Sequence, residues 1–132
     1  MSGETLLVVD DNAANRKLLD FVLSKQGHDV RTAADGEEAL AMLREWRPRM
    51  ILLDLQLPGI DGLEVARRIK ADRATRSIVI LAVTAYAMKG DERTAIAAGC
   101  DGYLTKPIDT RALPGIVADL LARNTSDAAA ER

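Results

Sequence analysis

Short apolar runs separated by segments of helical period are the feature that most restricts how this chain can fold. The runs cover residues 6–9, 50–53 and 78–83 and consist of Leu, Ile, Val, Met and Ala. Runs this short and this uniformly apolar are typical of strands that are buried on both faces of a parallel sheet. Between the runs, apolar residues recur at the i, i+3, i+4 spacing of amphipathic helices. The alternation predicts an α/β chain.

Two more polar segments complete the predicted set of strands, and helical segments follow every strand. The strands are expected at 6–9, 28–33, 50–53, 78–83 and 101–105, and the helices near 13–26, 36–47, 62–69, 88–98 and 113–121. Right-handed crossovers then give a parallel sheet with helices on both faces. We expect the three most apolar strands at the centre, which gives the order 2-1-3-4-5. The predicted fold is therefore a doubly wound (βα)5 sheet of flavodoxin-like type.

Length and composition set further limits. A chain of 132 residues is expected to form one domain, which we place at residues 4–123, followed by a flexible tail at 124–132. The net charge of −2 and the lack of a basic block argue against direct nucleic-acid binding. No apolar stretch is long enough to span a bilayer, and the N-terminus lacks the pattern of a signal peptide. Cys100 is the single cysteine, so no internal disulfide is expected and a cytoplasmic location is favoured.

Charged and hydroxyl side chains follow the predicted strands. Asp10 and Asp11 follow the first run, Asp54 follows the central one, and Thr84 and Lys106 end the fourth and fifth strands. The carboxyl ends of parallel strands meet at one crevice, at the point where the strand order reverses. Two bare carboxylates about 4 Å apart repel by roughly 4 kcal/mol at an effective dielectric of 20, so three of them need a cation. We expect a divalent metal, with Lys106 kept for an anion that binds later.

Each of these residues also has an ordinary structural interpretation. Asp10 and Asp11 are compatible with a solvated turn before a helix, where acidic side chains match the positive end of the dipole. Asp54 and Thr84 are compatible with simple strand ends, and Lys106 with a surface lysine before a turn. The bond from Lys106 to Pro107 is a candidate for the cis form. Their shared position at one sheet edge favours the functional interpretation.

Four sequence motifs strengthen the functional interpretation of these residues. VVDDN at 8–12, LLDLQLPGIDGLE at 52–64, VTAYAMKGD at 83–91 and GYLTKPI at 102–108 resemble the receiver domain of bacterial two-component response regulators, the CheY-like superfamily. The resemblance covers about residues 5–123. Within the family, the chain is most similar to stand-alone receivers. Receivers that are attached to hybrid histidine kinases have motifs of a similar kind.

The resemblance implies a role for each acidic residue. Asp54 matches the phosphoacceptor, Asp11 a direct ligand of Mg²⁺, and Asp10 a ligand that acts largely through water. The backbone carbonyl of Gln56 matches a further protein oxygen on the metal, for which Mn²⁺ is an alternative ion. Many receivers have Met where this chain has Gln56, and that position and Tyr86 flank the route of an attacking water.

The resemblance also implies switch and docking residues. Thr84 and Lys106 match the groups that bind the phosphoryl oxygens, and Thr84 and Tyr103 match the pair that changes position on activation. The docking surface for the phosphodonor is expected to contain Ala14, Asn15, Leu18 and Ile108.

The implied function is that of a single-domain response regulator in a phosphorelay. A phosphohistidine of a histidine kinase or histidine phosphotransfer protein is expected to phosphorylate Asp54 in a Mg²⁺-dependent reaction. A changed protein-binding face then signals to a downstream protein, and the chain is expected to be monomeric and to catalyse only its own phosphorylation and dephosphorylation. One alternative is a receiver-like binding module that works without phosphorylation. Another is an aspartate-nucleophile phosphohydrolase, which would need a second Asp where Gln56 stands.

Overall fold

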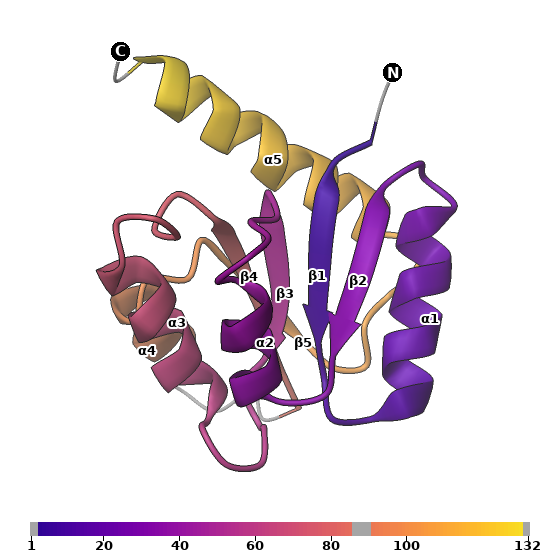
Figure 1. Cartoon of the computed structure of the whole chain (residues 1–132). Helices are drawn as coiled ribbons and strands as arrows, with labels where there is room; N and C mark the ends of the chain where they lie inside the picture. Colours follow the sequence, from indigo (N-terminus) through magenta and orange to yellow (C-terminus); the bar gives the residue numbers. More distant parts are fainter. Residues whose placement is uncertain (1–2, 86–90, 131–132) are drawn as a thin grey trace.

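Strands and helices alternate along the whole chain in this computed structural model, which describes residues 3–85 and 91–130 (Figure 1). The strands are β1 (Thr5–Val9), β2 (Asp29–Ala33), β3 (Met50–Asp54), β4 (Val79–Thr84) and β5 (Gly102–Thr105). The helices are α1 (Ala13–Ser24), α2 (Gly36–Met42), α3 (Gly62–Ala71), α4 (Asp91–Ala97) and α5 (Leu113–Ala130). The predicted succession of β-α units is confirmed.

The strands form one parallel sheet in the order β2-β1-β3-β4-β5, which confirms the predicted order. All residues of β3 and β4 are buried, whereas exposed and half-buried residues alternate along the edge strand β2. Burial on both faces explains why the central runs are uniformly apolar. Since β1 pairs with both β2 and β3, the order reverses beside β1, and the crevice of the sheet lies at the carboxyl ends of β1 and β3.

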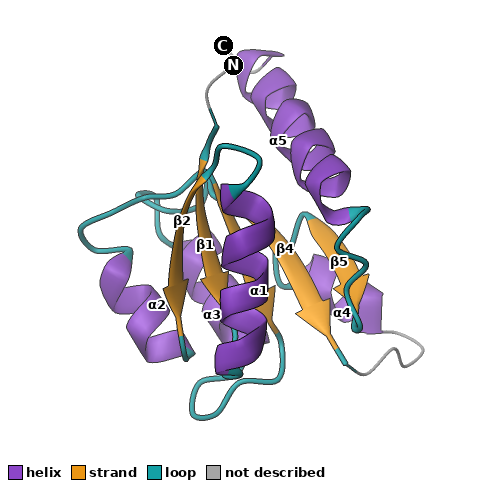
Figure 2. Cartoon of the chain, turned by 90° about the vertical axis from the view of Figure 1, so that its right-hand side faces the viewer, coloured by secondary structure: helices purple, strands orange, loops and turns teal. Residues whose placement is uncertain are grey.

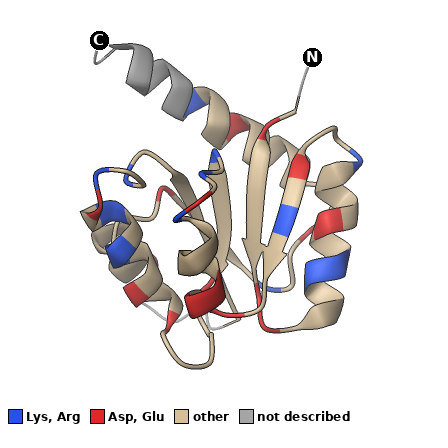
Figure 3. Ribbon diagram, viewed as in Figure 1, with Lys and Arg blue, Asp and Glu red and all other residues tan. Residues whose placement is uncertain are grey.

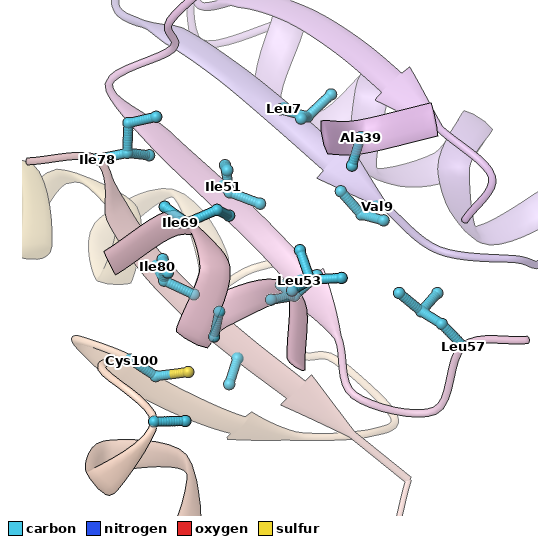
Figure 4. Close-up of a cluster of buried hydrophobic side chains, with 14 of the residues drawn as sticks. Leu7, Val9, Ala39, Ile51, Leu53, Leu57, Ile69, Ile78, Ile80 and Cys100 are labelled. Carbon is cyan, nitrogen blue, oxygen red and sulfur yellow. The ribbon is translucent and has the colours of Figure 1, made fainter. Parts of the chain in front are cut away.

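Two aliphatic cores cover the two faces of the sheet. Alternate residues of β1, β3 and β4 point to each side, so that Leu7, Ile51 and Ile80 belong to one core and Leu6, Leu52 and Leu81 to the other. The first core packs against α2, α3 and α4, and the second packs against α1 and α5. Figure 4 shows Ala39 of α2 and Ile69 of α3 among the strand side chains of the first core. The turned view in Figure 2 shows α1 and α5 on one side of the sheet and α2 and α3 on the other.

The corner between α4 and β5 adds a thiol to the first core. Cys100 is 6% exposed and packs with Ile78, Ile80 and Ala95 in that cluster. Burial, with a smaller contribution from the negative charge of Asp101, raises the pKa of the Cys100 thiol to about 11. The thiol therefore acts as a small apolar side chain in the folded protein.

Local signals in the sequence explain several helix ends. Asn12 caps α1, with its side-chain oxygen accepting from the backbone N–H of Asn15 at 3.0 Å. Asp35 and Asp61 cap α2 and α3 in the same way. Gly27 follows α1 with a φ of 93°, a conformation that glycine adopts without steric cost. Among the described residues, no helix has the length and apolar character needed to cross a bilayer.

Two boundaries differ from the sequence prediction. The backbone of α5 stays helical to Ala130, beyond Arg123, where we expected the folded domain to end. The run of alanines at 128–130 gives a physical reason, because alanine has the highest intrinsic helix propensity. The flexibility of residues 124–132 stays a prediction. The helix expected at 88–98 is described from Asp91 to Ala97, and residues 86–90 lie outside the described part of the chain.

Candidate functional site

The strand ends bring three carboxylates together, as the topology predicted. Asp10 and Asp11 directly follow β1, and Asp54 is the last residue of β3, with Val9 paired to Leu53 in the ladder between the two strands. One oxygen from each of the three carboxylates lies within 4.8 Å of the others. Acidic residues mark the loop that follows the arrowhead of β1 in Figure 3.

The three carboxylates differ in their exposure to solvent. Asp10 and Asp54 are only 3% and 2% exposed, whereas Asp11 is exposed. Buried carboxylates are costly unless they are paired or bound to a cation. The edge of the sheet therefore holds two acidic groups that require a cation, beside a third acidic group that solvent reaches.

Lys106 supplies positive charge to this cluster. Its Nζ lies 3.0 Å from Asp54 Oδ2 and 3.2 Å from Asp10 Oδ2. In this structure Lys106 therefore pairs with the carboxylates themselves, and its binding of a later anion stays a prediction. Because both carboxylates are buried, an ammonium within hydrogen-bond distance of each is more strongly stabilised there than in solvent. The peptide bond between Lys106 and Pro107 is cis, as the sequence suggested.

The ionisation of Asp54 and Lys106 reflects this environment. Burial raises the pKa of Asp54 above its usual value, and the backbone N–H of Gln56 and the charge of Lys106 offset this only in part. Burial by itself would lower the pKa of Lys106, but its hydrogen bond to Asp54 and the charges of Asp54 and Asp10 raise it. Burial thus leaves Asp54 less acidic than usual even with Lys106 beside it, while Lys106 stays charged.

Hydrogen bonds fix the loop that carries Asp10. Its Oδ1 accepts from the backbone N–H of Asn12 at 2.8 Å, and its carbonyl accepts from Nη1 of Arg16 at 2.8 Å. Asn15 donates to Asp10 Oδ2 at 3.4 Å. The first turns of α1 therefore hold the Asp10 carboxylate in place against Lys106.

A glycine positions the backbone around Asp54. A Cβ atom at Gly62, the first residue of α3, would collide with the carbonyl oxygen of Asp54 and would lie 2.6 Å from Cα of Leu55. The N–H of Gly62 donates to the carbonyl of Leu55 at 3.2 Å. Only a residue without a side chain lets α3 begin this close to the end of β3.

Gln56 joins Asp54 to the end of β4. Its backbone N–H donates to Asp54 Oδ1 at 2.9 Å, and its Nε2 donates to Oγ1 of Thr84 at 2.6 Å. Its Oε1 accepts from the backbone N–H of Ala85 at 3.0 Å. Thr84 itself is buried. The sequence analysis placed Gln56 beside the metal and the route of water, and missed the hydrogen bonds that its side chain makes to Thr84 and Ala85.

The predicted switch aromatic lies on the last strand of the sheet. Tyr103 pairs with Ala82 in the ladder between β5 and β4, and its side chain is half-buried against the first core. The hydroxyl oxygen of Tyr103 is buried in this structure. Tyr86, the residue that we placed beside Gln56 on the route of water, lies outside the described residues.

A pocket of about 400 Å³ opens beside the acidic cluster, between α1 and the loop after β5. Its lining includes Asp10 and Lys106 together with the predicted docking residues Asn15, Leu18 and Ile108. Ala14, the fourth of these, is exposed one turn before Leu18 but is not part of the lining. Leu18 is 48% exposed, and Phe21 on the same helix is 64% exposed and was missed by the sequence analysis.

A doubly wound sheet with three carboxylates at its switch point and a lysine from its last strand is the arrangement of a receiver domain. The family model of the response regulator receiver domain matches residues 6–118, and the chain belongs to that family. Members of this family are in general signalling domains rather than enzymes.

Named relatives and solved structures agree with this assignment. The chain is 43% identical over 105 residues to the polar-differentiation response regulator DivK of Brucella anthropi, which covers 80% of this chain and 85% of DivK. A CheY-like receiver domain protein of Methanospirillum hungatei superposes with a TM-score of 0.88 at 27% identity, covering 96% of this chain and 99% of that one. The receiver domain of a sensor histidine kinase of Pseudomonas aeruginosa, solved with magnesium coordinated in its active-site cleft, gives 0.83 at 33% identity, with 92% and 99% covered.

Proposed function

We propose that this chain is a single-domain response regulator of a phosphorelay, and that Asp54 accepts a phosphoryl group from a phosphohistidine. The observation that carries the proposal is the position of Asp54. Its carboxylate is 2% exposed, lies with Asp10 and Asp11 at the switch point, and has Lys106 Nζ at 3.0 Å. A structural carboxylate gains little from two acidic neighbours, whereas an acceptor of phosphoryl groups needs cations around it.

The acidic cluster fits a magnesium ion. Mg²⁺ prefers oxygen ligands, keeps several waters and is usually bound by one or two carboxylates together with phosphate oxygens. Asp11 and Asp54 would hold the ion directly, Asp10 largely through water, and the backbone carbonyl of Gln56 would add an oxygen. When bound, Mg²⁺ or Mn²⁺ would offset the repulsion between the acidic cluster and an incoming phosphoryl group.

The transfer step is a displacement at phosphorus. An oxygen of the Asp54 carboxylate attacks the phosphorus, the new O–P bond forms, and the N–P bond to the donor imidazole breaks, with its electron pair returning to the nitrogen. Lys106 then binds a phosphoryl oxygen in place of the carboxylates, and the hydroxyl of Thr84 donates a hydrogen bond to another phosphoryl oxygen. The product is an aspartyl phosphate, whose added charge is stabilised by the ammonium.

The signal leaves through a protein-binding face. Lys106 follows β5 directly and Thr84 ends β4, so their movement toward a phosphoryl group shifts the ends of both strands. Tyr103 reorients with them, and the face made by α4, β5 and α5 changes its affinity for a downstream protein. Phosphorylation thus shifts the population between two states of the domain. The protein is expected to act as a monomer in the cytoplasm.

The pocket beside the site is the proposed docking surface for the phosphodonor. Leu18 and Ile108 line it with apolar side chains, together with Asn15 and Lys106, and Ala14 lies on the same part of α1. A helix of a kinase or phosphotransfer protein, with a phosphohistidine flanked by apolar residues, suits this surface. The imidazole then enters beside Lys106 and faces Asp54.

Two alternatives are less well supported. A phosphohydrolase of this fold needs a carboxylic acid two residues after its nucleophile, and here Gln56 presents a carboxamide that is held by Thr84 and Ala85. An amide cannot supply the proton that a leaving alcohol needs. If the domain were a binding module that is never phosphorylated, the burial of Asp10 and Asp54 beside Lys106 would have no functional explanation.

Intact-mass measurement tests the proposal. The protein is incubated with acetyl phosphate and Mg²⁺, and the expected product carries one phosphoryl group that is lost in mild base, as an acyl phosphate is. Asp54→Asn removes the nucleophile with little change in volume and should give no adduct. Absence of the adduct in the wild type, or an adduct that persists in Asp54→Asn, would overturn the assignment. Steady release of phosphate over many turnovers would favour the phosphohydrolase.

A further inference from the structure

The carboxamide of Gln56 spans the gap between the loop after β3 and the end of β4. Its Nε2 donates to Thr84 Oγ1 at 2.6 Å and its Oε1 accepts from the N–H of Ala85 at 3.0 Å. Both atoms of one side-chain amide are therefore used on two consecutive residues of β4 and its loop. Its backbone N–H, meanwhile, is bound to Asp54 Oδ1.

The partners of this amide are the groups that an anion on Asp54 would recruit. Asp54 pairs with Val83 in the ladder between β3 and β4, and the next two residues are Thr84 and Ala85. A hydroxyl and a backbone N–H at the edge of the crevice are suited to bind phosphoryl oxygens. A backbone N–H is a single donor, so the N–H of Ala85 cannot serve Gln56 Oε1 and a phosphoryl oxygen fully at the same time.

We propose that the Gln56 side chain is a latch that holds Thr84 and Ala85 in the resting state and that a phosphoryl group on Asp54 must displace. The inference rests on the proposed function and adds to it a positioning residue that sets how strongly the site binds a phosphoryl group. The Oε1 atom of Gln56 occupies, in the resting protein, the acceptor position that the phosphoryl oxygen takes later. Phosphorylation then exchanges one acceptor for another on the same N–H group.

The strength of the latch follows from its exposure. Gln56 and Ala85 are exposed, whereas Thr84 is buried, so water competes for one of the two hydrogen bonds more than for the other. Net hydrogen-bond contributions are modest, and partly exposed bonds lie at the low end of that range. Removing the latch should therefore tighten the binding of a phosphoryl analogue about 5-fold, which corresponds to about 1 kcal/mol.

Beryllium fluoride, which binds a carboxylate as a phosphoryl analogue, is the probe. The full chain is titrated with it at a fixed, saturating Mg²⁺ concentration, and the dissociation constant is measured by calorimetry. Gln56→Met keeps the length of the side chain and the backbone carbonyl but removes both hydrogen bonds, and Gln56→Leu is a second variant of the same kind. Gln26→Met, on an exposed residue after α1, is the matched control and should bind as the wild type does.

An NMR signal separates a latch from a general effect on stability. The amide proton of Ala85 should resonate further upfield in unliganded Gln56→Met than in the wild type, because its acceptor is gone. With beryllium fluoride bound, the Ala85 signals of the two proteins should converge. A variant that merely loosened the fold would spread shift changes over the core and would not bind the analogue more tightly.

The outcomes distinguish the latch from the proposed function. Binding about 5-fold tighter in Gln56→Met and Gln56→Leu, with the Ala85 shift, supports the latch. Binding within 2-fold of the wild type in both variants, or weaker binding, overturns it even where acetyl phosphate still modifies Asp54 in the wild type. A wild type that neither binds beryllium fluoride nor accepts a phosphoryl group overturns the proposed function and the latch with it.

Discussion

Replacing Lys106 by Met tests whether one ammonium keeps two buried carboxylates stable. Nζ of Lys106 lies within 3.2 Å of both Asp10 Oδ2 and Asp54 Oδ2. Removing one partner of a fully buried ion pair costs about 3–5 kcal/mol, because the other charge is left uncompensated. The Lys106 side chain is 22% exposed, so solvent screens part of the interaction and the expected loss at pH 7.5 is about 2–3 kcal/mol.

The loss should depend on pH in a defined direction. Because the pKa of Asp54 is raised above 3.8 in the folded state, the folded protein binds this proton more tightly than the unfolded chain. Its contribution to stability is therefore present at low pH and is lost as pH rises through the raised pKa. Without Lys106 the pKa of Asp54 rises further, so this loss becomes larger. The raised pKa of Lys106 means that its own stabilising contribution is fully present below 10.5 and disappears only above that value.

Urea unfolding followed by circular dichroism at pH 5 and pH 7.5, without divalent ions, measures the effect. The difference between wild type and Lys106→Met should be smaller at pH 5 than at pH 7.5, because the raised pKa of Asp54 lets protonation relieve more of its uncompensated charge at the lower pH. Lys17→Met, on an exposed residue of α1, is the control and should change stability by less than about 0.5 kcal/mol at either pH. An equal cost of Lys106→Met at both pH values, or a more stable variant at pH 7.5, would show that Lys106 does not stabilise the two buried carboxylates.

Two further predictions concern the metal and the donor. Asp11→Asn should weaken Mg²⁺ binding at least about 10-fold by calorimetry without loss of stability, because Asp11 is exposed and removing its charge relieves repulsion within the acidic cluster. Equal Mg²⁺ affinity would exclude Asp11 as a ligand. Leu18→Asp places a charge in the lining of the pocket and should slow transfer from a phosphorylated phosphotransfer protein at least about 10-fold, measured as loss of label from the donor. An unchanged rate would remove Leu18 from the docking surface.

The fold could be predicted from the sequence because the apolar runs, the expected strand order and the local helix signals all indicated the same structure. The apolar runs at 50–53 and 78–83 have no polar residue and are shorter than a typical helix, so a fully buried strand suits them best. Since the ends of parallel strands share an edge, the strand order by itself brought Asp10 and Asp54 together before any distance was known. The cap at Asn12 was visible for a similar reason, because its signal is local.

The side-chain contacts of the site could not be predicted from the sequence. They depend on the directions of side chains and on which of several possible hydrogen-bond or ion-pair partners each group takes. The bridge from Gln56 to Thr84 and Ala85 joins residues on two loops, and no local pattern specifies it. Lys106 was expected to bind an anion, and its ion pairs with the buried Asp10 and Asp54 depend on side-chain positions that no local pattern specifies. The exposure of Phe21 was hidden because an aromatic residue at helical spacing is more often part of a core.

The lone thiol at the corner between α4 and β5 has a practical consequence. With a pKa of about 11, only about one Cys100 side chain in ten thousand is a thiolate at neutral pH, and the sulfur is also shielded from solvent. Alkylation of Cys100 therefore requires the corner to open, so its rate reports the frequency of that opening. Because Cys100 is the single cysteine of the chain, the labelling needs no engineered site. A comparison of rates with and without a phosphodonor would show whether events at Asp54 loosen or tighten the opposite end of β5.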